Sequence, residues 1–255
     1  MTLAILVRDL IHDRAEKQRL GAELAASRAV QQVLILERIP EVEGLTIEAV
    51  YEPFGEVGGD FYQILPLADG GSLIAIGDVS GKGMPAAMMV SLLVGTLHAL
   101  VETTTSPGQL LAGMNRLVLG RSHGGFTTCL ILRVGADGTA TFANAGHISP
   151  YRNGQELQCE NGLPLGLVAE ASYAETRFEL GEGEQLTLLT DGVVEARNVG
   201  GELFGFERTS ACTAGTAETI ARSAQGFGQD DDITVLTVER QGIGTSGHNL
   251  AAAAS

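Results

Sequence analysis

Four short motifs contain the acidic residues of this chain that could do chemistry. They read GGDFY at residues 58–62, GDVSG at 77–81, TDG at 190–192 and DDDIT at 230–234. Asp78 follows the apolar run 73–76 and Asp191 follows the apolar run 186–189. Runs this short and apolar, bounded by turn residues, predict buried strands. We therefore expect carboxylates at strand ends, where a rigid element holds them among the loops.

Carboxylates that converge in this way need a cation between them. Two unit charges about 4 Å apart repel by roughly 4 kcal/mol at an effective dielectric constant near 20. The motifs offer oxygen ligands with no Cys or His partner, which is the donor set of hard ions such as Mg²⁺ or Mn²⁺. The sequence therefore predicts a site for divalent cations.

The glycines around Asp78 do not form a phosphate-binding loop of the Walker type. That loop needs four residues between its first Gly and the Gly-Lys pair, followed by Ser or Thr. Only three residues separate Gly77 from Gly81, and Gly83 follows Lys82. The alternative is that Asp78 is a metal ligand and that the glycines let a backbone carbonyl and the substrate come close.

The overall composition excludes several classes of partner. A chain of 255 residues can hold one large domain, and its formal net charge is −15. Nucleic acids and anionic membranes call for Lys/Arg patches, which this chain lacks, so we expect no nucleic-acid partner. The cysteines show no CxxC spacing, which indicates reduced thiols in the cytoplasm. The apolar residues 3–7 are too few to span a bilayer, but they could follow a membrane span in a longer parent protein.

Helix-forming residues dominate the first part of the chain. Residues 1–37 are rich in Ala, Leu, Glu, Arg and Gln, with a rough heptad spacing, which predicts a helical linker and allows a coiled-coil homodimer. Pro40 ends this helix. We expect a globular domain over residues 38–241 and a disordered Gly/Ser/Ala tail over 242–255.

Within the domain, alternating strands pair as hairpins around the turns at 69–71 and 137–138. An apolar helix, rich in Met and Leu, is expected over residues 85–102, packed against a sheet. A second helix is expected from Ser106, a third helical region over 207–224, and a last strand over 233–239. Hairpins with paired helices predict an α+β fold with antiparallel sheets.

Taken in order, these motifs resemble those of the metal-dependent protein phosphatases of the protein phosphatase 2C type, and in particular the bacterial branch of SpoIIE and RsbU. The likeness runs from about residue 31 to 239 and includes NAGH at 144–147 and LPLG at 163–166. The resemblance implies a four-layer αββα sandwich, in which helices flank two antiparallel sheets. It also implies two Mn²⁺ or Mg²⁺ ions in a cleft at one edge.

Carried onto this chain, the resemblance implies a role for each acidic motif. Asp78 would bridge the two ions, with the carbonyl of Val79 as a further ligand. Asp191 and Asp231 would complete the shell of one ion, and Asp60 would hold the other, directly or through water. Two ions about 3.5–4 Å apart can lower the pKa of bound water toward about 7 and so supply hydroxide for attack on phosphorus.

Some residues of the motifs admit two interpretations. Asp232 competes with Asp231 for one ligand position, and the Asp-Asp-x-Thr pattern favours Asp231. His147 could carry a proton, but we favour a structural histidine that orders a loop beside the cleft. Lys82 could face a phosphate, although a surface lysine is the commoner case, and Asp230 is expected to be solvated.

The sequence also departs from the family at several positions. Gln63 stands where the branch usually has Asp, so a peripheral metal contact would be missing. Ser80 occupies the place of a histidine that is the expected general acid in eukaryotic relatives, which leaves the proton donor unassigned. The segment between residues 204 and 229 is shorter than usual.

The resemblance implies a phosphoserine/phosphothreonine protein phosphatase of bacterial signalling. Its substrate would be a small phosphorylated anti-sigma-factor antagonist, and an upstream sensor or membrane domain could precede it in a longer parent protein. The alternative is a catalytically silent module of the same fold that binds a partner. The four retained aspartates argue against silence, since a silent copy has no reason to keep charges that repel. The N-terminal helix could in addition transmit a signal as a dimer.

Overall fold

The computed structural model describes Arg14, Arg19 and residues 38–55, 58–121 and 125–242. The predicted helical linker over 1–37, its coiled-coil dimer and the disordered tail over 242–255 lie almost entirely outside these residues. Those assignments, and the domain limits drawn from them, stay predictions.

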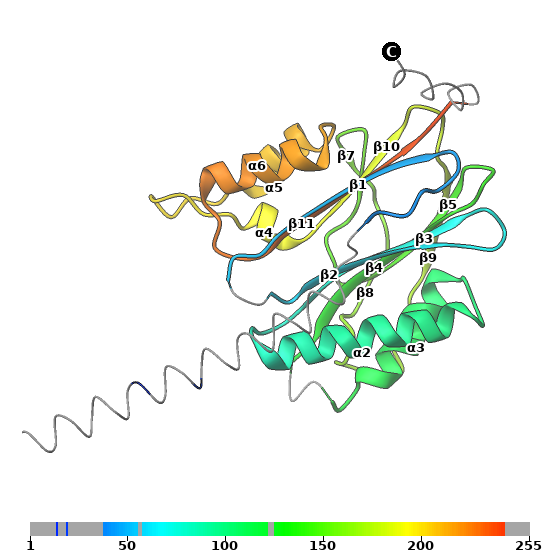
Figure 1. Ribbon diagram of the computed structural model, residues 1–255, viewed down its shortest axis with the longest axis horizontal. Helices are drawn as coiled ribbons and strands as arrows, with labels where there is room; N and C mark the ends of the chain where they lie inside the picture. The colour runs from blue at the N-terminus through cyan, green and yellow to red at the C-terminus, as the bar shows by residue number, and fades with distance from the viewer. Residues whose placement is uncertain (1–13, 15–18, 20–37, 56–57, 122–124, 243–255) are drawn as a thin grey trace, which may run out of the picture.

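Two sheets form the centre of the domain (Figure 1). The first contains, in spatial order, β1 (Leu45–Glu52), β11 (Ile233–Arg240), β10 (Gln185–Leu189), β6 (Tyr151–Arg152) and β7 (Gln155–Glu156). The second contains β2 (Asp60–Pro66), β3 (Ser72–Val79), β4 (Thr127–Val134), β5 (Thr139–Ala145) and β8 (Asn161–Gly162), and β9 (Glu175–Glu179) also pairs with β5. Among the described residues, these strands pair in antiparallel fashion except for β5 with β8, which are parallel.

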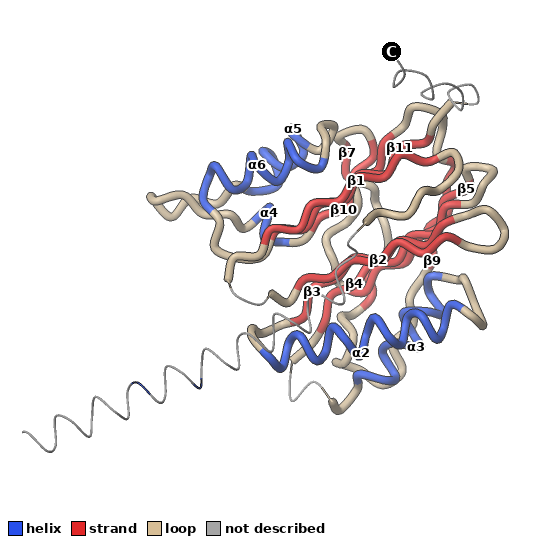
Figure 2. The backbone as a smooth tube through the Cα atoms, viewed as in Figure 1, coloured by secondary structure: helices blue, strands red, loops and turns tan. Residues whose placement is uncertain are grey.

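Helices cover the outer face of each sheet (Figure 2). The second sheet carries α2 (Met84–Val101) and α3 (Pro107–Val118), and the first carries α4 (Asp191–Val194), α5 (Gly205–Cys212) and α6 (Ala217–Gly228). The order of layers is therefore helices, sheet, sheet, helices, and the predicted four-layer αββα sandwich is confirmed. The helical region expected over 207–224 is divided into α5 and α6.

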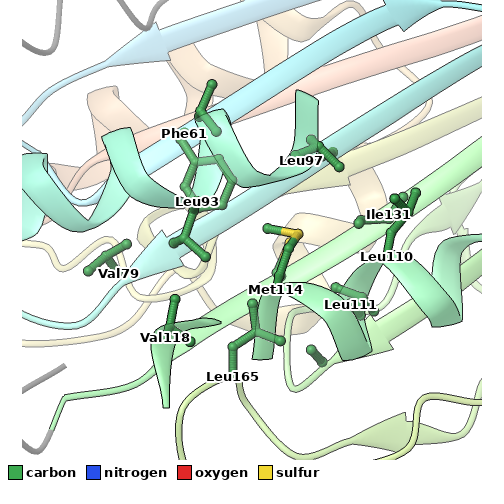
Figure 3. Close-up of a cluster of buried hydrophobic side chains, with 14 of the residues drawn as sticks. Phe61, Val79, Leu93, Leu97, Leu110, Leu111, Met114, Val118, Ile131 and Leu165 are labelled. Carbon is green, nitrogen blue, oxygen red and sulfur yellow. The ribbon is translucent and has the colours of Figure 1, made fainter. Parts of the chain in front are cut away.

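Three buried clusters hold these four layers together. Strand β3 shows how one strand serves two of them, because successive side chains of a strand point to opposite faces. Leu73 and Ala75 belong to the cluster under α2 and α3, which Figure 3 shows, whereas Ile74 and Ile76 belong to the cluster between the sheets. A strand buried on both faces must be apolar throughout, which explains the continuous apolar run that precedes Asp78.

Helix α2 is long and apolar enough to cross a membrane by length and composition alone. Its packing explains that composition, because Leu93, Leu97 and four further residues are buried in the domain. The helix begins after Gly83, whose φ of 76° lies in the left-handed region that favours glycine. Met88 differs from the buried residues of this helix, because it is 62% exposed and does not pack in the core.

The contrast between Ile76 and Met88 gives a test of this packing. Ile76 is fully buried between the sheets, so Ile76→Ala should lower the free energy of unfolding by about 2–5 kcal/mol. Met88→Ala removes a side chain of similar size from a solvent-exposed position and should change it by less than about 0.5 kcal/mol. Urea denaturation of both variants measures the difference, and equal losses would contradict the layer arrangement.

Candidate metal and active site

Strand pairing brings the predicted aspartates to one end of the sandwich. In the second sheet, the antiparallel register of β2 and β3 places Asp60 directly opposite Asp78. In the first sheet, Asp191 begins α4 after β10, and residues 231–232 precede the neighbouring strand β11. Figure 1 shows α4 and the start of α2 at this same end of the two sheets. The structure therefore gathers acidic residues that lie far apart in the sequence.

The carboxylates raise one another's pKa values, as a cluster without cations should. Burial, and then the charges of Asp191, Asp231 and Asp232, raise the pKa of Asp78 to about 7. Burial and the charge of Asp78 raise the pKa of Asp60 well above its ordinary value. The pKa of Asp191 is raised by burial, then by Glu195 and Asp231. Strongly perturbed carboxyl groups that meet in this way are typical of functional sites.

The donors at this end suit a hard cation that keeps part of its water shell. In the part of the chain that the structure describes, no group of three or more His, Cys, Asp or Glu side chains is gathered tightly enough to hold an ion alone. Mg²⁺ commonly binds through one or two carboxylates and several waters, so such an enclosure is not required. Asp78 is buried beside the negative charges of Asp191, Asp231 and Asp232, and a cation would offset both the burial and the repulsion that raise its pKa.

Two neighbouring aspartates have different surroundings, which bears on the choice between them. Asp232 is buried, and its two carboxylate oxygens accept backbone hydrogen bonds from Phe54 at 3.0 Å and Gly59 at 2.8 Å. The Asp231 side chain is 52% exposed and lies 3.3 Å from the Lys82 ammonium. Asp232 therefore holds the segment between β1 and β2, while Asp231 has oxygens within reach of solvent, which favours Asp231 as a ligand.

Glycines in the motifs allow the acidic segments to approach closely. A Cβ atom on Gly59 would lie 2.4 Å from the Val79 carbonyl oxygen, and one on Gly192 would lie 1.9 Å from the Asp232 carbonyl oxygen. Both distances are far below normal contact, so no side chain fits at either position. The glycine in each of these two motifs is thus required by the packing of one acidic segment on another.

His147 and Ser80 both have structural partners. His147 is buried, which lowers its pKa to about 4, and its Nδ1 lies 2.9 Å from the Thr128 hydroxyl. The Asn144 side chain accepts a hydrogen bond from the His147 backbone N–H and donates one to the His147 carbonyl. His147 is thus part of an ordered loop, in keeping with the structural role that we favoured. The Ser80 hydroxyl accepts a hydrogen bond from the Phe126 N–H at 2.8 Å. Neither residue is placed as a ready proton donor.

Three further positions complete the account of the predicted residues. Gln63 Oε1 lies 3.1 Å from His98 Nε2 of α2, so the Gln63 side chain packs toward the helix layer. Lys82 is exposed, but its ammonium also lies 5.4 Å from the centre of the Phe54 ring, and it stands at the site through its ion pair with Asp231. The Asp230 side chain is 46% exposed, and its Oδ2 lies 3.5 Å from Arg197 Nε.

Comparison with known proteins places the chain in a family. Residues 68–241 match the family model of stage II sporulation protein E (SpoIIE). The chain belongs to the SpoIIE family. The family membership that the order of the motifs predicted is thereby confirmed.

Individual relatives agree with this assignment. Phosphoserine phosphatase RsbU of Bacillus subtilis is 32% identical over 199 residues, which cover 74% of this chain and 58% of RsbU. The chain therefore spans little more than half the length of that relative. The SiaA-PP2C domain of Pseudomonas aeruginosa has the same fold, with a TM-score of 0.72 and 24% identity over 88% of this chain and 98% of that domain. The structure of RsbX in complex with magnesium is also similar, with a TM-score of 0.63 and 14% identity over 80% and 99% of the two chains.

The raised pKa of Asp78 predicts an unusual pH dependence of stability without metal. The folded state binds this proton more tightly than the unfolded state, whose pKa is near the ordinary 3.8. The contribution of Asp78 to the free energy of unfolding of chelator-treated protein should therefore fall as the pH rises from about 4 to about 7. Asp78→Asn should reduce this fall and stabilise the metal-free protein at pH 7.

Urea denaturation at several pH values measures both effects. Asp137→Asn is the matched control, because hydrogen bonds from Thr139 lower the pKa of that exposed aspartate, and it should leave the slope between pH 5 and 7 unchanged. Loss of stability at pH 7 in Asp78→Asn would show that this carboxylate supports the fold instead of straining it.

Proposed function

We propose that this chain is a Mn²⁺- or Mg²⁺-dependent phosphoserine/phosphothreonine protein phosphatase that uses two ions. The convergence of Asp60, Asp78, Asp191 and Asp231 from both sheets, with the pKa of Asp78 raised to about 7, carries this proposal. Asp78 would contact both ions and the Val79 carbonyl would be a further ligand. Asp191 and Asp231 would serve one ion, and Asp60 the other.

The residues of the site have separate tasks in this chemistry. Bound ions of this kind supply hydroxide from water at neutral pH and stabilise charge on phosphoryl oxygens. The protein fixes where the ligands stand: Asp232 holds the segment that leads into β2, and Gly59 brings that segment onto the Val79 carbonyl. Lys82 adds a positive charge beside Asp231, where an anionic substrate would enter. Neither His147 nor Ser80 is placed to donate a proton. We therefore assign protonation of the leaving group to solvent water.

We propose a small phosphorylated anti-sigma-factor antagonist in the bacterial cytoplasm as the substrate. A relative of this chain, RsbU, is named a phosphoserine phosphatase, and this supports a phosphoserine substrate. The net charge of −15 argues against a nucleic-acid partner. We also propose a homodimer through residues 1–37 and an upstream sensor or membrane anchor in a longer parent protein. Sedimentation of the full chain beside a variant lacking residues 1–36 tests the dimer.

The second candidate function is a silent module that only binds a partner. Such a module would have the same architecture, but it would gain nothing from carboxylates that destabilise the metal-free fold. The cluster around Asp78 therefore favours the enzyme, and a direct assay separates the two functions.

Hydrolysis of a phosphoserine peptide or an aryl phosphate should require added Mn²⁺ or Mg²⁺ and stop on chelation. Asp78→Asn removes the ligand shared by both ions, so the rate should fall by at least about 10²–10³-fold, the scale of losing a principal electrostatic stabiliser. Asp230→Asn alters an aspartate of the same motif region that pairs with Arg197, and it should stay within about threefold of wild type. Full activity with excess chelator would exclude the metal-dependent reaction, and hydrolysis at no metal concentration would favour the silent module.

A further inference from the structure

Asp60 is held by two hydroxyl groups that come from the opposite sheet. Asp60 begins β2 and is 3% exposed. Thr190 directly follows β10, Thr234 lies in β11, and both threonines are fully buried. The Thr190 hydroxyl donates to Asp60 Oδ2 at 2.7 Å, and the Thr234 hydroxyl donates to the same oxygen at 2.6 Å. Both bonds therefore cross from the first sheet to the second inside the protein.

The direction of the Thr190 bond is fixed by its surroundings. The Thr234 N–H donates to Thr190 Oγ1 at 3.0 Å, so the hydroxyl proton of Thr190 is directed to Asp60. Thr190 is also the N-cap residue of α4, a position where a threonine side chain usually accepts a backbone hydrogen bond from the helix. Its side chain makes no such bond here. The hydroxyl serves the carboxylate in place of the helix.

Both hydroxyls donate to the same carboxylate oxygen of Asp60, Oδ2, so Oδ1 takes part in neither bond. Hydrogen bonds to an ionised carboxylate are short and strong, so two of them determine the orientation of the group.

The same two bonds relate Asp60 to the acidic residues of the other sheet. Thr190 immediately precedes Asp191, and Thr234 follows Asp231 by three residues along the same segment. A shift of one sheet against the other would have to stretch both bonds. The spacing between Asp60 and the acidic ends of the first sheet is therefore set through these hydroxyls.

We infer that Thr190 and Thr234 are positioning residues that orient Asp60 for cation binding and hold the two halves of the site at a set spacing. The inference rests on the proposed function, because it takes Asp60 to be a metal ligand. Changing residues that hydrogen-bond to ligating carboxylates commonly weakens metal binding by about 10–100-fold. The effect should appear in metal affinity itself, independently of turnover.

Isothermal titration of the full-length, metal-free protein with Mn²⁺ tests this inference. Thr190→Val and Thr234→Val keep the side-chain shape and remove the hydroxyl, and each should weaken Mn²⁺ binding by about tenfold or more. Thr190→Ser and Thr234→Ser restore the hydroxyl and should stay within about threefold of wild type. Thr187→Val is the matched control, since Thr187 is a buried residue of β10 whose hydroxyl donates to the Thr213 carbonyl at 2.7 Å, away from Asp60.

Stability and activity measurements separate positioning from a general effect on folding. Thermal melts of the metal-free proteins should show a loss in Thr187→Val as well, whereas weaker Mn²⁺ binding should be confined to the Thr190 and Thr234 valine variants. Raising the Mn²⁺ concentration should restore much of their phosphatase rate. If a valine variant does not fold, the comparison of Ala with Ser at the same position isolates the hydroxyl. Wild-type affinity in the variants that lack the hydroxyl would overturn the inference.

One further variant distinguishes failure of this inference from failure of the proposed function. If wild-type protein binds no Mn²⁺, the proposed metal site itself is wrong. If wild type binds Mn²⁺ and Asp60→Asn binds it equally well, Asp60 is not a ligand and the positioning role falls. If Asp60→Asn binds weakly while both valine variants match wild type, only the role of the two hydroxyls is wrong.

Discussion

Several aspartates are buried close together at one end of the sandwich, where their negative charges repel one another. Burial and three neighbouring carboxylates raise the pKa of Asp78 to about 7, so the metal-free protein carries a strained site. Cations would relieve that strain, and a fold that lacks them must resist it by packing. Stability and function are therefore opposed at this position, as is common where charged groups are arranged for chemistry.

The four-layer packing supplies the resistance. Strand β3, which leads directly to Asp78, is buried on both faces, with Leu73 facing the helices and Ile76 facing the other sheet. A strand held from both sides cannot move its end away from a repelling neighbour without opening two cores. The densely packed interior thus transmits the position of one carboxylate to the whole sandwich.

Polar contacts between the sheets complete the site. The Asp232 carboxylate holds the segment before β2 through two backbone N–H groups, and the hydroxyls of Thr190 and Thr234 hold Asp60. These groups are buried and hydrogen-bonded, which avoids the cost of an unsatisfied polar group. A site assembled from two sheets needs such contacts, because hydrophobic packing alone does not fix the direction in which a carboxylate points.

Apolar runs and hairpin turns are local patterns, and they predicted an α+β fold with antiparallel sheets, while the resemblance carried by the ordered motifs implied the four-layer sandwich. Strand-end aspartates in the same motifs pointed to the candidate ligands. The partners of individual side chains depend on how the chain packs: Asp232 holds a loop while Asp231 faces solvent, Met88 lies outside the core, and two threonines hydrogen-bond to Asp60. The Thr190 bond to Asp60 joins residues 130 positions apart, and the Asp232 bond to Phe54 spans 178. No local pattern encodes such partners, because they are chosen by how two sheets pack against each other.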